Sequence, residues 1–114
     1  MLTSWQSDIA NLALIEVYKK EVHIKRKFMD NPENFQPENE EERRWVEHYD
    51  NLSKYISEMI RGLDEKDRLT FLKDLQPTDL SLMNLYLQAL KIEDYETCAV
   101  AKALLVERGF KIPN

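Results

Sequence analysis

Glycine and proline are scarce in this chain of 114 residues, and their positions limit what it can fold into. All six stand where a helix can begin or end: Gly62, Gly109, Pro32, Pro37, Pro77 and Pro113. Between them apolar residues recur at steps of three and four, whereas strict alternation of β-branched residues is missing. The sequence therefore predicts an all-α fold, a compact bundle of about five helices.

The length suits one helical domain spanning residues 1–114. The first helix is predicted over Ser4–Met29 and is followed by a polar segment rich in Asn, Pro, Gln and acids. This segment predicts a long loop at about residues 30–38, which we expect to be the most mobile part of the chain. Pro37 suits the first turn of the next helix, where several glutamates complement the helix dipole.

The second predicted helix carries the clearest pattern of the chain. Its apolar residues are spaced 4, 3, 4, 3 and 4, which predicts a seam that a partner helix can fill: Trp45, Tyr49, Leu52, Ile56, Met59 and Leu63. Gly62 is expected to end this helix in the left-handed conformation.

Three shorter features complete the predicted bundle. Asp64 is expected to cap a third helix that reaches about Leu75 and faces inward through its apolar residues: Leu69, Phe71, Leu72 and Leu75. Thr78 or Asp79 opens a mostly buried fourth helix. A fifth helix runs to about Arg108 and is rich in small residues, so the last two helices are predicted to form an αα-hairpin.

The turn of this hairpin resembles that of a tetratricopeptide-type hairpin. The resemblance lies in residues 89–96, Ala-Leu-Lys-Ile-Glu-Asp-Tyr-Glu, and covers about 20 residues of the chain. The family builds its peptide groove from repeats 34 residues long, and no copy stands 34 residues upstream, where Arg61 falls opposite Tyr95. We therefore expect a generic hairpin.

Charge and cysteine content exclude several classes of protein. Sixteen basic against 21 acidic residues give a net charge of −5, which argues against a nonspecific binder of polyanions. A lone cysteine, Cys98, excludes an intramolecular disulfide scaffold. No apolar run approaches the roughly 20 residues that cross a bilayer, and residues 1–10 lack a basic start, so we expect no membrane contact, no signal peptide and a cytoplasmic location.

The sequence offers no motif for catalysis or metal binding. His23 and His48 lack partners at ligand spacing, and glycine-dependent phosphate loops and nucleophile elbows are missing. The adjacent acids Glu93 and Asp94 are typical of helix capping rather than acid–base catalysis. Cys98 can pair with a histidine as a nucleophile, but its Ala and Leu neighbours favour an inert buried thiol. We expect no enzyme and no cofactor.

A basic run near the end of the first helix is the one local positive feature. The candidate patch comprises Lys19, Lys20, His23, Arg26 and Lys27. Cations at this position complement the dipole of the helix C-terminus and can pair with the acidic segment that follows. The alternatives are an acidic protein partner and, ranked third, nucleic acid.

The first half of the first helix is apolar on two sides. Trp5, Ile9 and Leu12 lie on one side, and a second apolar group lies almost opposite, so this helix is either sandwiched between neighbours or meets a second molecule. We therefore hypothesise a non-enzymatic protein that binds another protein or itself through Trp5, Ile9 and Leu12. The alternative is a nucleic-acid-binding regulator that uses the basic run.

Overall fold

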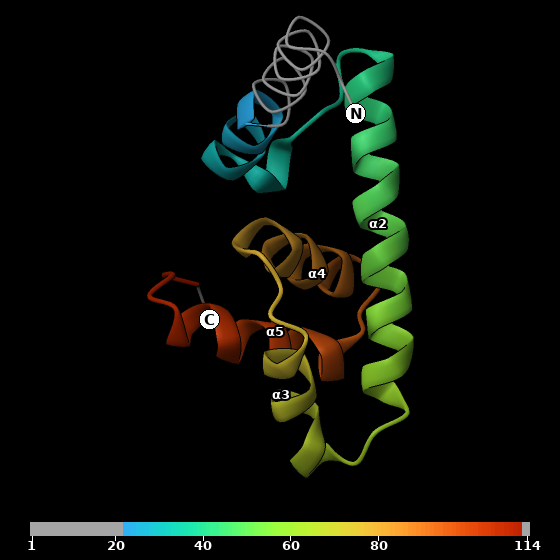
Figure 1. Ribbon diagram of the computed structural model, residues 1–114, viewed down its shortest axis with the longest axis vertical. Helices are drawn as coiled ribbons and strands as arrows, with labels where there is room; N and C mark the ends of the chain where they lie inside the picture. The colour runs from blue at the N-terminus through green and yellow to red at the C-terminus, as the bar shows by residue number, and fades with distance from the viewer. Residues whose placement is uncertain (1–21, 113–114) are drawn as a thin grey trace, which may run out of the picture. The chain divides into compact units, whose positions relative to one another are not determined.

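The computed structural model describes residues 22–112, and within them the all-α prediction is confirmed. Helices joined by turns and loops make up this part of the chain, without a strand (Figure 1). No helix of these residues combines the length and the apolarity needed to cross a bilayer. The chain divides into two compact units, residues 1–35 and 36–114.

In the first unit, residues 22–30 are helical and a 3₁₀ turn, η1 (Pro32–Asn34), follows. The rings of Phe28 and Phe35 meet edge to face with centroids 5.6 Å apart. This contact folds the segment after residue 30 back onto the helix, so the predicted long loop contains local structure of its own.

The second unit begins with α2 (Glu40–Arg61), the longest described helix. Asn39 caps it, since its side chain accepts a hydrogen bond from the backbone N–H of Glu42 at 2.9 Å and donates one to the Glu42 carboxylate at 3.1 Å. This reciprocal cap starts the helix at Glu40, three residues after Pro37. The prediction of Pro37 in the first turn is therefore wrong.

The buried face of α2 differs from the predicted seam. The buried residues in the second half of the helix are Ser53, Ile56, Ser57 and Ile60. Leu52 and Met59, two members of the predicted seam, are more than one-third exposed, so the seam prediction is wrong at these positions. The two small serines let α2 approach α4 closely, and Ser53 accepts a hydrogen bond from the buried Asn84 side chain at 3.0 Å.

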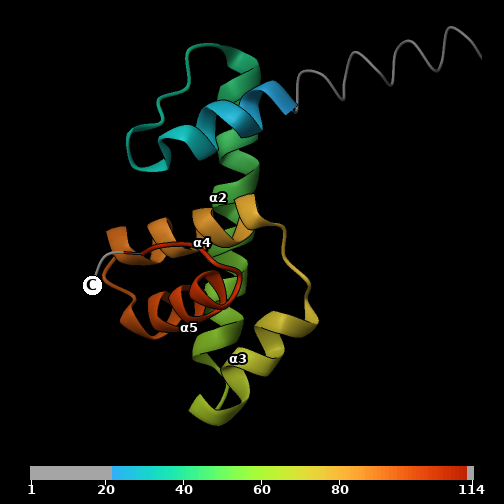
Figure 2. The same cartoon turned by 90° about the vertical axis from the view of Figure 1, so that its left-hand side faces the viewer.

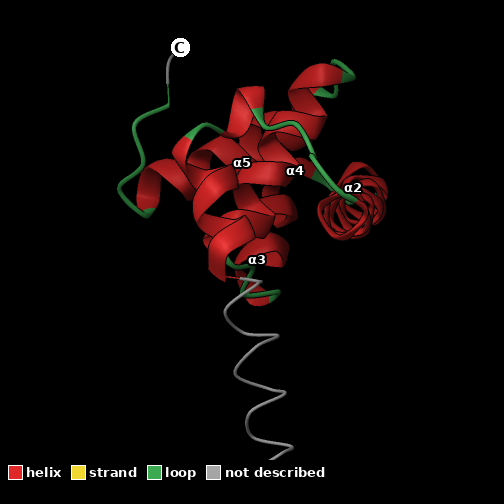
Figure 3. Ribbon diagram, turned by 90° about the horizontal axis from the view of Figure 1, so that it is seen from above, coloured by secondary structure: helices red, strands yellow, loops and turns green. Residues whose placement is uncertain are grey.

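The remaining helices are α3 (Glu65–Asp74), α4 (Asp79–Lys91) and α5 (Tyr95–Glu107). Helix α4 packs against both α2 and α5, and α3 packs against α5 and α2. Figures 2 and 3 show α4 and α5 side by side, both on one side of α2. The expected αα-hairpin is confirmed, as is the largely buried character of α4. Leu75, expected to face inward, is instead exposed after the end of α3.

Helix ends in the left-handed conformation occur at positions other than the expected one. Gly62 has a φ of −79°, so its predicted left-handed cap is wrong. Positive φ angles occur instead at Gln76 (50°), Glu93 (59°) and Gly109 (95°), each just after a helix. Glycine adopts this conformation without strain, whereas glutamate and glutamine do so at a cost of about 1 kcal/mol.

Candidate functional site

The side chains expected to form a site lie only partly in the described residues. Trp5, Ile9 and Leu12, the candidate interface, lie outside residues 22–112, as do Lys19 and Lys20 of the basic run. His23 and Arg26 are exposed on the helix of residues 22–30. The ammonium group of Lys27 stands 5.5 Å from the centre of the Phe35 ring, a cation–π contact within the first unit. Lys27 therefore contacts the segment that follows its own helix.

A different site stands out at the turn between α4 and α5. An open pocket of about 500 Å³ lies there, lined by Arg61, Ile92, Glu93, Asp94, Tyr95 and Glu96. Arg61 comes from the last turn of α2, and the other five residues are consecutive. The pocket thus joins two segments that are distant in the sequence.

The turn owes its shape to a Schellman motif at the end of α4. The N–H of Asp94 donates to the carbonyl of Ala89 at 2.8 Å, and the N–H of Glu93 donates to that of Leu90 at 3.2 Å. Glu93 takes the left-handed position that glycine usually holds. Asp94 then caps α5, since its Oδ1 accepts a hydrogen bond from the N–H of Thr97 at 3.3 Å. The expected capping role of the Glu93–Asp94 pair is therefore confirmed for Asp94.

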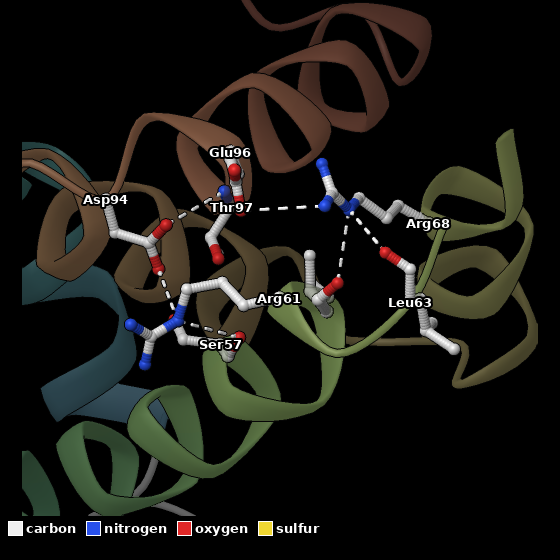
Figure 4. A network of polar contacts seen from close by, with 8 residues as sticks. Ser57, Arg61, Leu63, Arg68, Asp94, Glu96 and Thr97 are labelled. Carbon is white, nitrogen blue, oxygen red and sulfur yellow. Dashed lines mark hydrogen bonds and ion pairs between the residues drawn. The ribbon is translucent and has the colours of Figure 1, made fainter. Parts of the chain in front are cut away.

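Arg61 and Asp94 join the end of α2 to the start of α5 (Figure 4). The Arg61 Nε lies 3.6 Å from Asp94 Oδ2 and donates to the backbone carbonyl of Ser57 at 3.4 Å. The Asp94 side chain is almost completely buried, and Oδ2 accepts no hydrogen bond. A separation of 3.6 Å gives an ion pair but is too long for a hydrogen bond. One oxygen of a buried carboxylate therefore lacks a donor.

Arg68 from α3 supports the same region. Its Nε donates to the carbonyl of Ile60, in the last turn of α2, at 3.2 Å and to that of Leu63, just after the helix, at 3.1 Å. Its Nη2 lies 3.5 Å from the Glu96 carboxylate, which lines the pocket. Figure 4 shows the Arg68 side chain between the end of α2 and the start of α5. A single guanidinium thus joins α2, α3 and α5 and holds the wall of the pocket in place.

The pocket is electrostatically acidic. It is lined by three carboxylates, those of Glu93, Asp94 and Glu96, and by one guanidinium, that of Arg61, so acidic groups outnumber basic ones. Such a lining attracts cations and repels anions. The described residues contain no group of three or more His, Cys, Asp or Glu side chains that can hold a metal ion.

Cys98 lies one turn into α5, and its thiol is buried as expected. Burial raises the pKa of the Cys98 thiol; the nearby Lys102 lowers it, and the Asp94 carboxylate raises it further. A higher pKa leaves less of the reactive thiolate at neutral pH. The prediction of a desolvated thiol is confirmed.

We expect iodoacetamide at pH 7.4 to alkylate Cys98 at least about tenfold more slowly in the native protein than in urea, because burial limits both access and ionisation. Cys98→Ala should cost at most about 1 kcal/mol of unfolding free energy, whereas Cys98→Leu should cost more through overpacking. Rapid alkylation of the native protein, accompanied by loss of a measurable activity, would instead place Cys98 in an active site.

Sequence reasoning did not identify the pocket, although it singled out five of the six residues as part of the hairpin turn. The missing residue, Arg61, precedes Asp94 by 33 positions, and no sequence pattern connects the two. Comparison of the chain with protein-family models, curated proteins and solved structures finds no match in any of the three.

Proposed function

We propose that this chain is a non-enzymatic helical protein that acts by binding another protein. The observation that supports this most directly is the exposure of Tyr95 (65%) and Ile92 (63%), two large apolar side chains on the lining of one pocket. Protein interfaces are enriched in aromatic residues and arginine, and both kinds of side chain occur here. The αα-hairpin holds Ile92 and Tyr95 in a fixed arrangement, which lowers the entropy cost of binding.

The shape of the pocket favours a protein partner over a small substrate. Sites for small molecules are enclosed enough to bury most of the ligand, whereas this pocket is an open depression on the surface.

The lone buried cysteine and the absence of a spanning helix in residues 22–112 support a cytoplasmic place of action in this proposal.

A site-specific photo-crosslinker tests the proposal. We expect p-benzoylphenylalanine at position 95 to capture a partner in cells that the same group at position 106 does not. Val106 is also exposed on α5 and does not line the pocket, so it is a matched control. With the purified partner, Ile92→Ser combined with Tyr95→Ser should raise Kd at least about tenfold, whereas Val106→Ser should change Kd less than twofold.

Identical crosslinks from positions 95 and 106, or a Kd unaffected by the double substitution, would contradict the proposal. Multi-angle light scattering shows whether the partner is a second copy of this chain or a different protein. It therefore also tests the sequence-based hypothesis that Trp5, Ile9 and Leu12 mediate self-association. A gel-shift assay at two salt concentrations tests the nucleic-acid alternative, for which we expect no shift at physiological salt because the chain carries a net charge of −5.

A further inference from the structure

The pocket at the α4–α5 turn contains a polar atom that residues 22–112 leave without a hydrogen-bond partner. Only 5% of the Asp94 side chain is exposed, and its Oδ2 accepts no hydrogen bond. Buried polar atoms almost always have a hydrogen-bond partner, and one that lacks it reduces stability. Oδ2 therefore keeps the capacity to accept an N–H hydrogen bond that the Arg61 ion pair, at 3.6 Å, does not supply.

The charge of the lining determines what kind of donor fits. Glu93 and Glu96 flank Asp94, so an incoming anion meets three carboxylates, whereas an incoming cation is attracted to them. The opposing group is Arg61, whose guanidinium lies over Oδ2. Because about half of the Arg61 side chain is exposed, it can turn outward and give up its place to another cation.

Two exposed apolar side chains of the pocket, Ile92 and Tyr95, can contact the part of a cationic ligand that does not reach Asp94. The ring of Tyr95 can stack on an ammonium or guanidinium group. Ile92 can pack against an aliphatic stem of three or four methylenes. Lysine and arginine side chains combine such a stem with a cationic head that donates hydrogen bonds.

We propose that the pocket binds a lysine or arginine side chain presented by the partner protein, with the Asp94 carboxylate accepting its N–H and the Arg61 guanidinium displaced outward. That the partner is a protein rests on the proposed function, whereas the preference for a cationic side chain rests on the pocket alone. A single side chain that competes with Arg61 should bind with a Kd in about the millimolar range, because a few hydrogen bonds and one ion pair supply only a small binding free energy.

Titrations with small probes test the chemistry without any partner. We expect N-acetyl-arginine methylamide and N-acetyl-lysine methylamide to shift the NMR signals of the backbone amides of residues 92–97 in the full chain. N-acetyl-citrulline methylamide, which keeps the shape of arginine but not its charge, should bind at least about tenfold more weakly. Equal binding of the citrulline derivative, or shifts confined to other residues, would overturn the proposal.

Two substitutions in the pocket should act in opposite directions. Asp94→Asn keeps a capping side chain and removes the charge, so the Kd for the arginine derivative should rise at least tenfold. Arg61→Gln removes the competing cation, so the same Kd should fall about threefold. An Arg61→Gln variant that binds no more tightly would overturn the proposal even if Asp94→Asn unfolds. No merely structural role of Asp94 predicts this pair of opposite changes.

Asp64→Asn is the matched control for charge, because Asp64 is the N-cap residue of α3, makes no capping hydrogen bond and lies outside the pocket. It should leave Kd within twofold of the wild-type value. N-acetyl-glutamate methylamide should shift none of residues 92–97, and binding there would show that Arg61 makes the pocket an anion site. A partner that depends on Tyr95 but not on Asp94 would leave the proposed function standing and overturn this inference.

Discussion

Ile60→Ala is expected to lower the free energy of unfolding by about 3 kcal/mol, whereas Met59→Ala, one position away, should cost less than about 1 kcal/mol. Ile60 is completely buried, so its truncation leaves a cavity in addition to the lost burial of apolar surface. Met59 is 38% exposed and leaves no enclosed cavity. Urea denaturation followed by circular dichroism measures both values.

The pair also tests which face of α2 packs inward. The predicted seam contains Met59 and not Ile60, whereas the structure buries Ile60. A larger loss for Met59→Ala than for Ile60→Ala would therefore show that the seam faces the core. Equal denaturant dependence of the two variants is needed for the comparison, because a changed m-value indicates a changed folded or unfolded state.

The starts of α4 and α5 are predictable because they depend on local capping residues, whereas Asp64 stands at the N-cap position of α3 without making the expected capping hydrogen bond. The side-chain oxygen of Thr78 accepts a hydrogen bond from the N–H of Ser81 at 3.1 Å. In the same way, Asp94 Oδ1 accepts one from the N–H of Thr97 at 3.3 Å. The sequence predicts too early a beginning for α2, because Pro37 also suits a first turn. Asn39 determines the start instead, since it is the residue that makes the capping bonds.

The inward face of α2 was predicted less well because a hydrophobic pattern gives serines no weight. Ser53 and Ser57 are buried, and their small size allows close approach of the neighbouring helix. Ser53 thereby accepts a hydrogen bond from the side chain of Asn84 on α4, which is itself buried. A buried polar pair of this kind depends on two helices at once, so neither helix predicts it alone.

The candidate pocket lay beyond sequence reasoning for a similar reason. Its five turn residues are consecutive, but the ion pair that gives it its shape joins Arg61 to Asp94 across two intervening helices. Neither an arginine at a helix end nor an aspartate at a helix start is unusual by itself. Only the packing of α2 against α5 brings them together.

The buried polar pair between α2 and α4 leads to the second large prediction. We expect Asn84→Asp to lower the free energy of unfolding by about 3 kcal/mol at pH 7. The Asn84 amide is buried and donates to Asp50 Oδ1 at 3.3 Å and to Ser53 Oγ at 3.0 Å. An aspartate of the same shape replaces these donors by a carboxylate next to the carboxylate of Asp50.

The loss should depend on pH in a definite direction. Burial and the neighbouring Asp50 charge both disfavour the ionised form, so the folded-state pKa of the introduced carboxyl lies above its unfolded-state value. Folding then favours the protonated form: the penalty is full above the folded-state pKa, shrinks as pH falls through it, and is smallest below the unfolded-state pKa. Urea unfolding at pH 7 and pH 4.5 should therefore show a smaller difference from wild type at the lower pH.

Two control variants separate charge burial from the loss of the amide. Asn84→Ala removes both hydrogen bonds without adding a carboxylate, so its cost should be nearly the same at pH 7 and pH 4.5. Asn51→Asp makes the same chemical change beside Asp50 in sequence but at an exposed position, and should cost no more than about 0.5 kcal/mol. A loss in Asn84→Asp of no more than about 0.5 kcal/mol at both pH values, as at the exposed position 51, would mean that position 84 is hydrated and that α2 and α4 are not packed over this pair as the structure has them.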